Sequence, residues 1–135
     1  MTTYIDPVAV INKLFAKAWG KKTDVAYEDT NFDPPSGKTW VRLNIKVFDG
    51  YQASIGSPGN NRQRRKGLVT VQVFQPQGKA GIDARAKAKD AVDVFMNRSE
   101  DGITFKKVYP KTVGNDGNGY YQAQALALFE YDDIS

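Results

Sequence analysis

Two stretches of the chain alternate between apolar and polar side chains, and this alternation constrains the fold more than any other feature. In residues 39–48, TWVRLNIKVF, and in residues 67–76, GLVTVQVFQP, every second side chain in the middle is apolar. A period of two places alternate side chains on opposite faces of a strand, so each stretch predicts a half-buried strand. Pro76 cannot donate a ladder hydrogen bond and is expected to end the second strand.

Two other stretches carry apolar side chains at spacings of three and four, which is the period of an amphipathic helix. The first begins at Asp6 and Pro7, a capping residue followed by a proline that fits the first helical turn, and ends at Gly20. The second covers about residues 80–97 and is rich in alanine. Its small side chains predict a close approach to a sheet.

Three further strands complete the pattern, and they are expected at residues 24–27, 103–110 and 120–131. The resulting order, α-β-β-β-α-β-β, groups the strands between the helices. This order predicts an α+β fold, with a mixed or antiparallel sheet of four to five strands and two helices packed on one face. The 135 residues are expected to form one domain, 1–135, with a core large enough to need no disulfide or metal.

The residue types that are missing restrict the chemistry. The chain has no cysteine and no histidine, which excludes Ser-His and Cys-His nucleophile pairs and zinc sites of the usual kind. Three acidic residues cluster in the turn YEDTNFDPP: Glu28, Asp29 and Asp33. Paired carboxylates can hold Mg²⁺ or transfer protons, but no second acidic cluster in the sequence joins them. A solvated or docking loop is favoured, and we expect no enzymatic activity, no cofactor and no metal.

A basic segment separates the two alternating strands. We expect a protruding loop over about residues 49–66, rich in glycine and asparagine near its middle, in a chain of net charge +4. It ends in four clustered cations: Arg62, Arg64, Arg65 and Lys66. The length and charge favour contact with a partner over simple solvation. No aromatic side chain lies between Tyr51 and Phe74 to stack on bases, so an acidic protein surface is favoured over nucleic acid.

Opposite charges on these two segments suggest how copies of the chain could meet. The acidic turn of one copy would contact the basic loop of the next, in a head-to-tail arrangement that can close into a ring. Trp40 is a further candidate for this interface, because tryptophan is enriched at interfaces. The same side chain could equally belong to the core.

Several of these pieces, taken in order, resemble a known family. VAYEDTNFDPPSGKTWVRLNI runs from a short strand through an Asn-Phe-x-Pro-Pro turn to Trp-Val-Arg, RRKGLVTVQVFQPQGKAG leads into the alanine-rich helix, and YYQAQALALFEYDD closes the chain. Over about residues 5–133 the chain resembles the phage tail terminator family and is similar in organisation to the tail terminators of lambda-like siphophages.

The resemblance implies a structural virion protein with no catalytic residues. It implies a sixfold ring on the end of the tail tube that stops tube polymerisation and offers a surface to the head. The expected partners are further copies of the chain, the major tail tube protein and a head-completion or connector protein, while DNA only passes through the lumen. The expected place is the head-proximal end of the virion tail, after assembly in the host cytoplasm.

No apolar run approaches membrane-spanning length, and the N-terminus lacks the pattern of a signal peptide. A cytosolic chain without a membrane partner is therefore expected. The alternatives are another head-tail connector or minor tail protein of the same fold and, less favoured, a basic nucleic-acid-binding module or an enzyme that uses carboxylates and a divalent metal.

Overall fold

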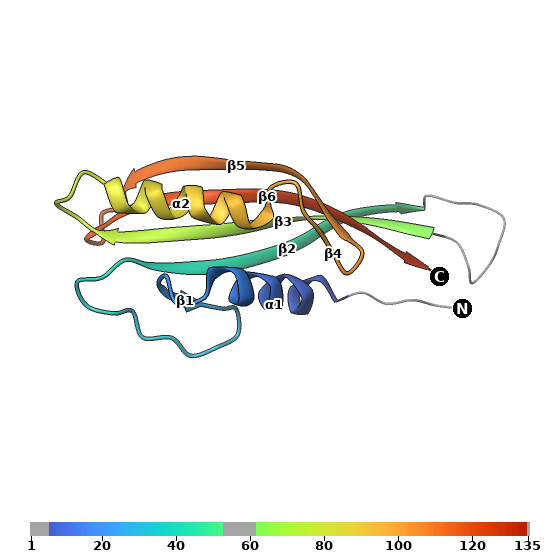
Figure 1. Cartoon of the computed structure of the whole chain (residues 1–135), viewed down its shortest axis with the longest axis horizontal. Helices are drawn as coiled ribbons and strands as arrows, with labels where there is room; N and C mark the ends of the chain where they lie inside the picture. Colours follow the sequence, from blue (N-terminus) through green and yellow to red (C-terminus); the bar gives the residue numbers. More distant parts are fainter. Residues whose placement is uncertain (1–5, 53–61, 135) are drawn as a thin grey trace.

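The computed structural model describes residues 6–52 and 62–134. Their elements, in chain order, are α1 (Pro7–Trp19), β1 (Asp24–Ala26), β2 (Trp40–Gln52), β3 (Arg62–Pro76), α2 (Ile82–Phe95), β4 (Ser99–Glu100), β5 (Ile103–Asn115) and β6 (Tyr120–Ile134). The strands lie side by side in the order β1-β2-β3-β6-β5-β4, and only β1 and β2 run parallel. Figure 1 shows the long strands curling together beside the two helices. The predicted α+β class is confirmed, although this sheet has six strands.

Both helices pack against one face of the sheet. A single core cluster contains the apolar stripe of α1, the buried alanines of α2 and the odd-numbered apolar side chains of β2, β3 and β6. Phe15 of α1 stacks on Trp19 and on Phe95 of α2, with ring centroids 5.1 and 6.0 Å apart. The alternation of the sequence therefore selects the face of each long strand that the helices cover.

The ends of α1 follow the sequence expectation. The Asp6 carboxylate accepts hydrogen bonds from the backbone N–H groups of Val8 and Ala9, at 3.2 and 3.4 Å. Pro7 occupies the first turn, and Gly20 ends the helix at a φ of 61°. These contacts satisfy N–H groups that a helix start leaves without partners.

The basic segment is not the loop that the sequence predicts. β2 continues to Gln52 and β3 begins at Arg62, so both ends of the 49–66 range belong to paired strands. The part of the expected loop that remains, residues 53–61, lies outside the described residues. The sequence pattern predicts that this strand begins at Gly67, because glycine is rare inside strands. A glycine inside a strand can also mark the close approach of another side chain. Gly67 is such a case, because Phe129 of β6 lies opposite it.

β5 also runs further than predicted, through Pro110 to Asn115. It pairs with β6 along most of its length, whereas β4 covers only Ile103 and Thr104 on its other side. Pro110 thus lies on an edge strand, where a missing N–H leaves no ladder hydrogen bond unmade. The connection between the two predicted strands, residues 111–119, is therefore shortened to residues 116–119.

The additional strand β4 comes from a hairpin that the sequence interpretation missed. Asp101 and Gly102 both have positive φ, 46° and 86°. This Asp-Gly pair favours a tight turn between antiparallel strands, and Ser99 pairs with Thr104 across it. The second helix accordingly ends at Phe95, before the predicted 97.

Candidate functional site

The structure pairs the basic segment with acidic residues of its own chain. Arg64 Nε donates to Asp132 Oδ1 at 2.7 Å and Arg64 Nη2 donates to Asp132 Oδ2 at 3.0 Å. These two hydrogen bonds join β3 to β6, where the two residues are in register, and a bidentate geometry is the strong form of such a pair. Arg64 therefore holds two strands together. This pair engages Arg64 within its own chain, and the predicted contact with an acidic partner stays a prediction.

The other three cations of the segment also belong to β3. Arg65 and Lys66 are exposed, and both interact within the chain. Lys66 faces Glu130 in the register, and Arg62 opens the strand opposite Ile134. Arg64 and Lys66 thus each lie opposite an acidic residue of β6, which is a cross-strand arrangement that stabilises a sheet.

One of the three acidic residues of the turn, Glu28, makes a hydrogen bond within the chain, and the other two are exposed. Glu28 Oε1 accepts a hydrogen bond from the backbone N–H of Ile45 at 2.9 Å. Because β1 covers β2 only as far as Arg42, Glu28 satisfies a donor on the uncovered edge of β2. Asp29 and Asp33 are exposed. In Figure 1 this turn and the start of β3 lie toward opposite ends of the long axis, so the structure does not bring the two charged segments together within one chain.

Trp40 belongs to a second, smaller core on the sheet face opposite the helices. It is 3% exposed and stacks on Phe74 with ring centroids 4.2 Å apart. Phe32 of the acidic turn and Tyr120 complete the cluster, at 5.1 and 6.1 Å from Trp40. The sequence allowed Trp40 to be either an interface residue or a core residue, and in this structure it is a core residue. Trp40 anchors the turn and offers no surface to a partner in the free chain.

The middle of that same sheet face is not covered by the helices. Leu68 of β3 faces Leu128 of β6, and Leu126 is the next residue of β6 on this face. All three are half-buried. Beside them Tyr109 of β5 is 38% exposed and Phe48 of β2 is 45% exposed. Exposed basic side chains border these residues: Arg42, Lys46, Lys107 and Lys111. We call this set of residues the open face.

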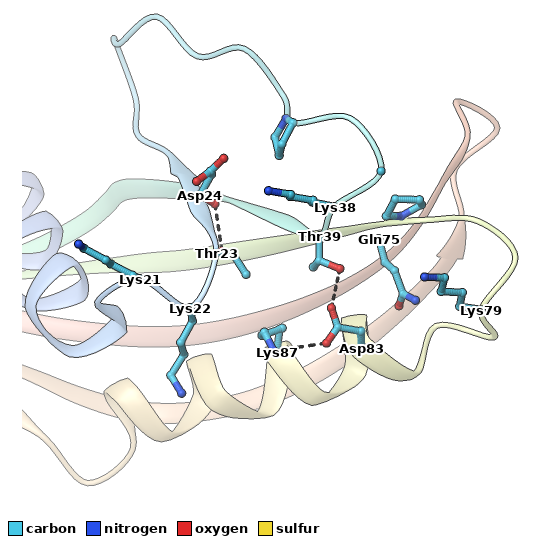
Figure 2. A pocket seen from close by; sticks show the side chains of 13 residues that line it. Lys21, Lys22, Thr23, Asp24, Lys38, Thr39, Gln75, Lys79, Asp83 and Lys87 are labelled. Atoms are coloured by element: carbon cyan, nitrogen blue, oxygen red, sulfur yellow. Dashed lines mark hydrogen bonds and ion pairs between the residues drawn. The ribbon is translucent and has the colours of Figure 1, made fainter.

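A hollow of about 490 Å³ lies between the α1–β1 connection, the segment before β2 and the start of α2 (Figure 2). Its charged lining consists of five lysines and two aspartates: Lys21, Lys22, Lys38, Lys79, Lys87, Asp24 and Asp83. These residues come from several separate stretches of sequence, so no spacing pattern identifies the hollow. We call it the lysine hollow.

Three of the lysines in the hollow directly follow a glycine in the sequence, and this repeated pair is a local sign of the hollow. Gly20, Gly37 and Gly78 precede Lys21, Lys38 and Lys79, and their φ angles are 61°, 71° and 108°. A positive φ is the conformation that glycine adopts most readily. Each pair therefore places a lysine directly after a sharp turn. The sequence analysis did not connect the three pairs.

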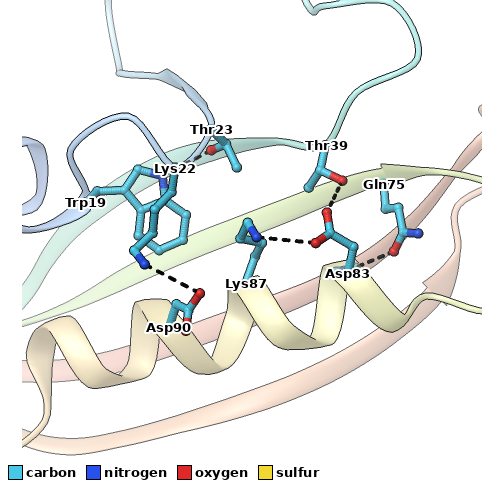
Figure 3. Close-up of polar contacts among 9 residues, drawn as sticks. Trp19, Lys22, Thr23, Thr39, Gln75, Asp83, Lys87 and Asp90 are labelled. Carbon is cyan, nitrogen blue, oxygen red and sulfur yellow. Dashed lines mark hydrogen bonds and ion pairs between the residues drawn. The ribbon is translucent and has the colours of Figure 1, made fainter.

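Two polar contacts pin the segments beside the lysine hollow to α2 (Figure 3). Thr39 Oγ1 donates to Asp83 Oδ2 at 2.5 Å, and Lys22 Nζ lies 3.9 Å from Asp90 Oδ2. Lys87 Nζ also donates to Asp83, at 3.3 Å to Oδ1. The Thr39 hydrogen bond is the main cause that lowers the pKa of Asp83, and Lys87 adds to it against the opposing effect of burial.

This lowered pKa makes a prediction for Asp83→Asn. A carboxyl group whose pKa falls on folding stabilises the fold above its unfolded pKa, and the contribution disappears as the pH falls through the folded pKa. We expect the variant to have a lower melting temperature than the parent at neutral pH, with the difference shrinking on acidification. Thermal unfolding across a pH series measures it. Asp93→Asn, which breaks an exposed pair with Lys89 on the same helix, is the control with little expected effect. A difference that grows on acidification would contradict the assignment.

Among residues 6–52 and 62–134, no group of three or more acidic side chains is placed to hold a metal ion. Over the same residues, no helix has the length and apolar character needed to cross a membrane. The Gly-rich residues 116–119 form the turn of the hairpin between β5 and β6. Asp116 Oδ1 accepts hydrogen bonds from the N–H groups of Asn118 and Tyr120, at 2.7 and 3.2 Å.

The chain is similar to known proteins in sequence pattern and in fold. A family model described as phage tail terminator protein matches residues 8–124. A solved structure shares the fold with a TM-score of 0.59 and 19% sequence identity, over 93% of this chain and 93% of that chain. No curated protein sequence matches the chain. At this identity the solved structure shows a shared fold only. The assignment to a family rests on the family model.

Proposed function

Because the chain belongs to the phage tail terminator family, we propose that it forms a ring on the end of the tail tube, stops tube polymerisation there and presents the surface to which the head attaches. The observation that carries the proposal is the family match over residues 8–124. The chain is thus a structural component of a phage tail. We propose a sixfold ring at the head-proximal end of the tail, assembled in the host cytoplasm.

The open face supports an assembly role. Half-buried leucines surrounded by lysines form a surface that is apolar at its centre and charged at its border, which is the usual anatomy of a protein interface. The partners that we propose are further copies of the chain, the major tail tube protein and a head-completion or connector protein. DNA would pass through the lumen only transiently, without a membrane or a cofactor taking part.

The head-to-tail contact between charged segments is proposed here for the exposed aspartates of the acidic turn. Asp29 and Asp33 are exposed, and no hydrogen bond or ion pair joins either to a described residue. They remain candidates for contact with a basic surface of the next copy. Arg64 is unsuitable for testing this contact, because its reversal would break the internal pair with Asp132.

We expect the double variant Asp29→Asn/Asp33→Lys to assemble poorly while folding normally; asparagine is used at position 29 because the φ of 56° there is one that Asn and Asp tolerate. Substitutions of exposed residues away from internal contacts change the free energy of unfolding by no more than about 0.5 kcal/mol. Sedimentation velocity would measure assembly, and thermal unfolding would check the fold. The matched control is Lys13→Gln/Lys17→Glu, which changes the charge on the exposed side of α1 by the same amount in the opposite direction. Unimpaired assembly of the acidic-turn variant would remove this turn from the contact.

The proposed function is tested by tube-length control. Purified tube protein is polymerised with and without the chain, and the products are imaged by cryo-electron microscopy. We expect shorter tubes, each ending in one ring of the chain. Tubes of unchanged length with bare ends would overturn the proposal, and density of the chain elsewhere in the virion would assign it to another head-tail component.

A further inference from the structure

The lysine hollow holds positive charge that the chain does not neutralise. Lys87 is engaged with Asp83, and Lys22 lies near Asp90. In contrast, Lys21, Lys38 and Lys79 make no hydrogen bond or ion pair with any described residue. Ammonium groups are hydrogen-bond donors only. Asp24 is the one lining carboxylate without an ion pair to a described residue, so the available charge of the hollow is positive overall and favours an anionic ligand.

A buried amide adds a neutral donor to the same hollow. Gln75, on β3, lines the hollow and is 3% exposed. Its Oε1 accepts the backbone N–H of Ala84 at 2.8 Å, which fixes the orientation of the amide and caps the first turn of α2 from outside the helix. Its Nε2 has no hydrogen-bond partner among the described residues, yet it is not among their fully buried unsatisfied atoms. The small exposed part of Gln75 thus presents an oriented N–H donor to the hollow.

Of the two carboxylates that line the hollow, Asp24 and Asp83, the second is not available as a cation ligand. Asp83 accepts from Thr39 and from Lys87, so both of its oxygens are engaged. The remaining donors surround this neutralised group. Figure 2 shows Lys38 and Lys79 on opposite sides of Thr39 and Asp83, on the rim formed by separate segments.

We propose that the lysine hollow binds carboxylate side chains of an acidic protein segment, with Lys38, Lys79 and the Gln75 amide as the donors. The volume of about 490 Å³ is that of a small-ligand site and suits one or two side chains rather than a duplex. No arginine or aromatic side chain lines the hollow, although these are the residues that favour bidentate phosphate contacts and base stacking. The acidic segment would come from a tail or head partner, and only this origin rests on the proposed function.

The test uses the full chain and a synthetic oligo-glutamate peptide. Nuclear magnetic resonance titration is expected to shift the backbone amides near Lys38, Gln75 and Lys79. The double variant Lys38→Ala/Lys79→Ala should weaken binding about 2- to 30-fold, because each of the two exposed charge pairs contributes about 0.2–1 kcal/mol, 1.4 kcal/mol corresponds to tenfold, and the amide remains. Both lysines are exposed, so the variant is expected to fold. Lys13→Ala/Lys17→Ala removes the same charge from α1 and should bind as the parent does.

Two results of these titrations would overturn the proposal. Equal weakening in both double variants would show that net charge alone attracts the peptide, and it would overturn the site. Inorganic phosphate or a single-stranded oligonucleotide that binds more tightly than the peptide at the same residues would overturn the carboxylate assignment. Peptide binding without control of tube length would instead contradict the proposed function and leave the site intact.

Discussion

Replacing Phe15 with alanine is expected to lower the free energy of unfolding by about 3–5 kcal/mol. Phe15 has no exposed surface. Its ring stacks on Trp19 within α1 and on Phe95 of α2, so it connects the two helices above the sheet. Alanine would remove the apolar ring and leave a cavity that the close-packed neighbours could fill only in part. Because single domains are stable by about 5–15 kcal/mol, the loss would be a large fraction of the total.

Urea unfolding followed by tryptophan fluorescence measures this effect, because Trp19 reports on the same cluster. Phe48→Ala is the matched control: it removes the same ring from a strand where 45% of the side chain is exposed. We expect this control to cost about 1–1.5 kcal/mol, since only about half of the residue leaves water on folding and full burial contributes about 1.5–3 kcal/mol. Similar losses in the two variants would mean that α1 does not pack on α2 and the sheet in this way.

The features that the sequence predicts correctly are those decided by near neighbours in the chain. The start of α1 depends on Asp6 and Pro7, and its end depends on Gly20. The buried face of each long strand depends on alternation, which is a property of consecutive residues. Such patterns need no knowledge of the partner strand, and the α+β class follows from them.

The features that the sequence analysis misses depend on partners that are distant in the chain. Arg64 belongs to a strand because Asp132 lies opposite it, and the two are 68 residues apart. Pro110 is tolerated because β5 is an edge strand beyond Thr104, and nothing near Pro110 in the sequence indicates that edge. Among these differences in the strands, the turn at Asp101 and Gly102 does have a local indication in the sequence.

The candidate sites show the same division. Clusters along the sequence drew attention to the acidic turn and the basic segment, yet Glu28 and Arg64 serve the fold of their own chain. The lysine hollow instead gathers residues from separate segments, linked by contacts such as the one between Thr39 and Asp83. Charge clustering along the chain is therefore a weak guide to the sites that this fold assembles, whereas the repeated Gly-Lys turns were the more useful trace.

Gly67→Val is expected to destabilise the protein by about 1–3 kcal/mol, the usual cost of overfilling a packed site. Strand propensity alone predicts the opposite sign, because valine is favoured over glycine in strands by up to about 1 kcal/mol. A Cβ atom at this position would collide with the Phe129 ring and would lie 2.6 Å from the carbonyl oxygen of Lys46. Ring and strand backbone would both have to move. The control is Thr70→Val, a nearly isosteric change on the open face of the same strand, which should change stability by less than about 1 kcal/mol.

A double variant shows how much of the loss in Gly67→Val comes from the Phe129 ring and how much from the Lys46 backbone. Residues in direct contact show coupling energies of about 0.5–3 kcal/mol, and the Phe129 ring lies where the Gly67 side chain would go. Adding Phe129→Leu to Gly67→Val should therefore cost less than the sum of the two single losses, measured by urea unfolding. The rescue should be incomplete, because the Lys46 carbonyl stays in place. Strictly additive losses would mean that Phe129 does not lie across Gly67. The pairing of β3 with β6 that carries the basic segment into the sheet would then need a different register.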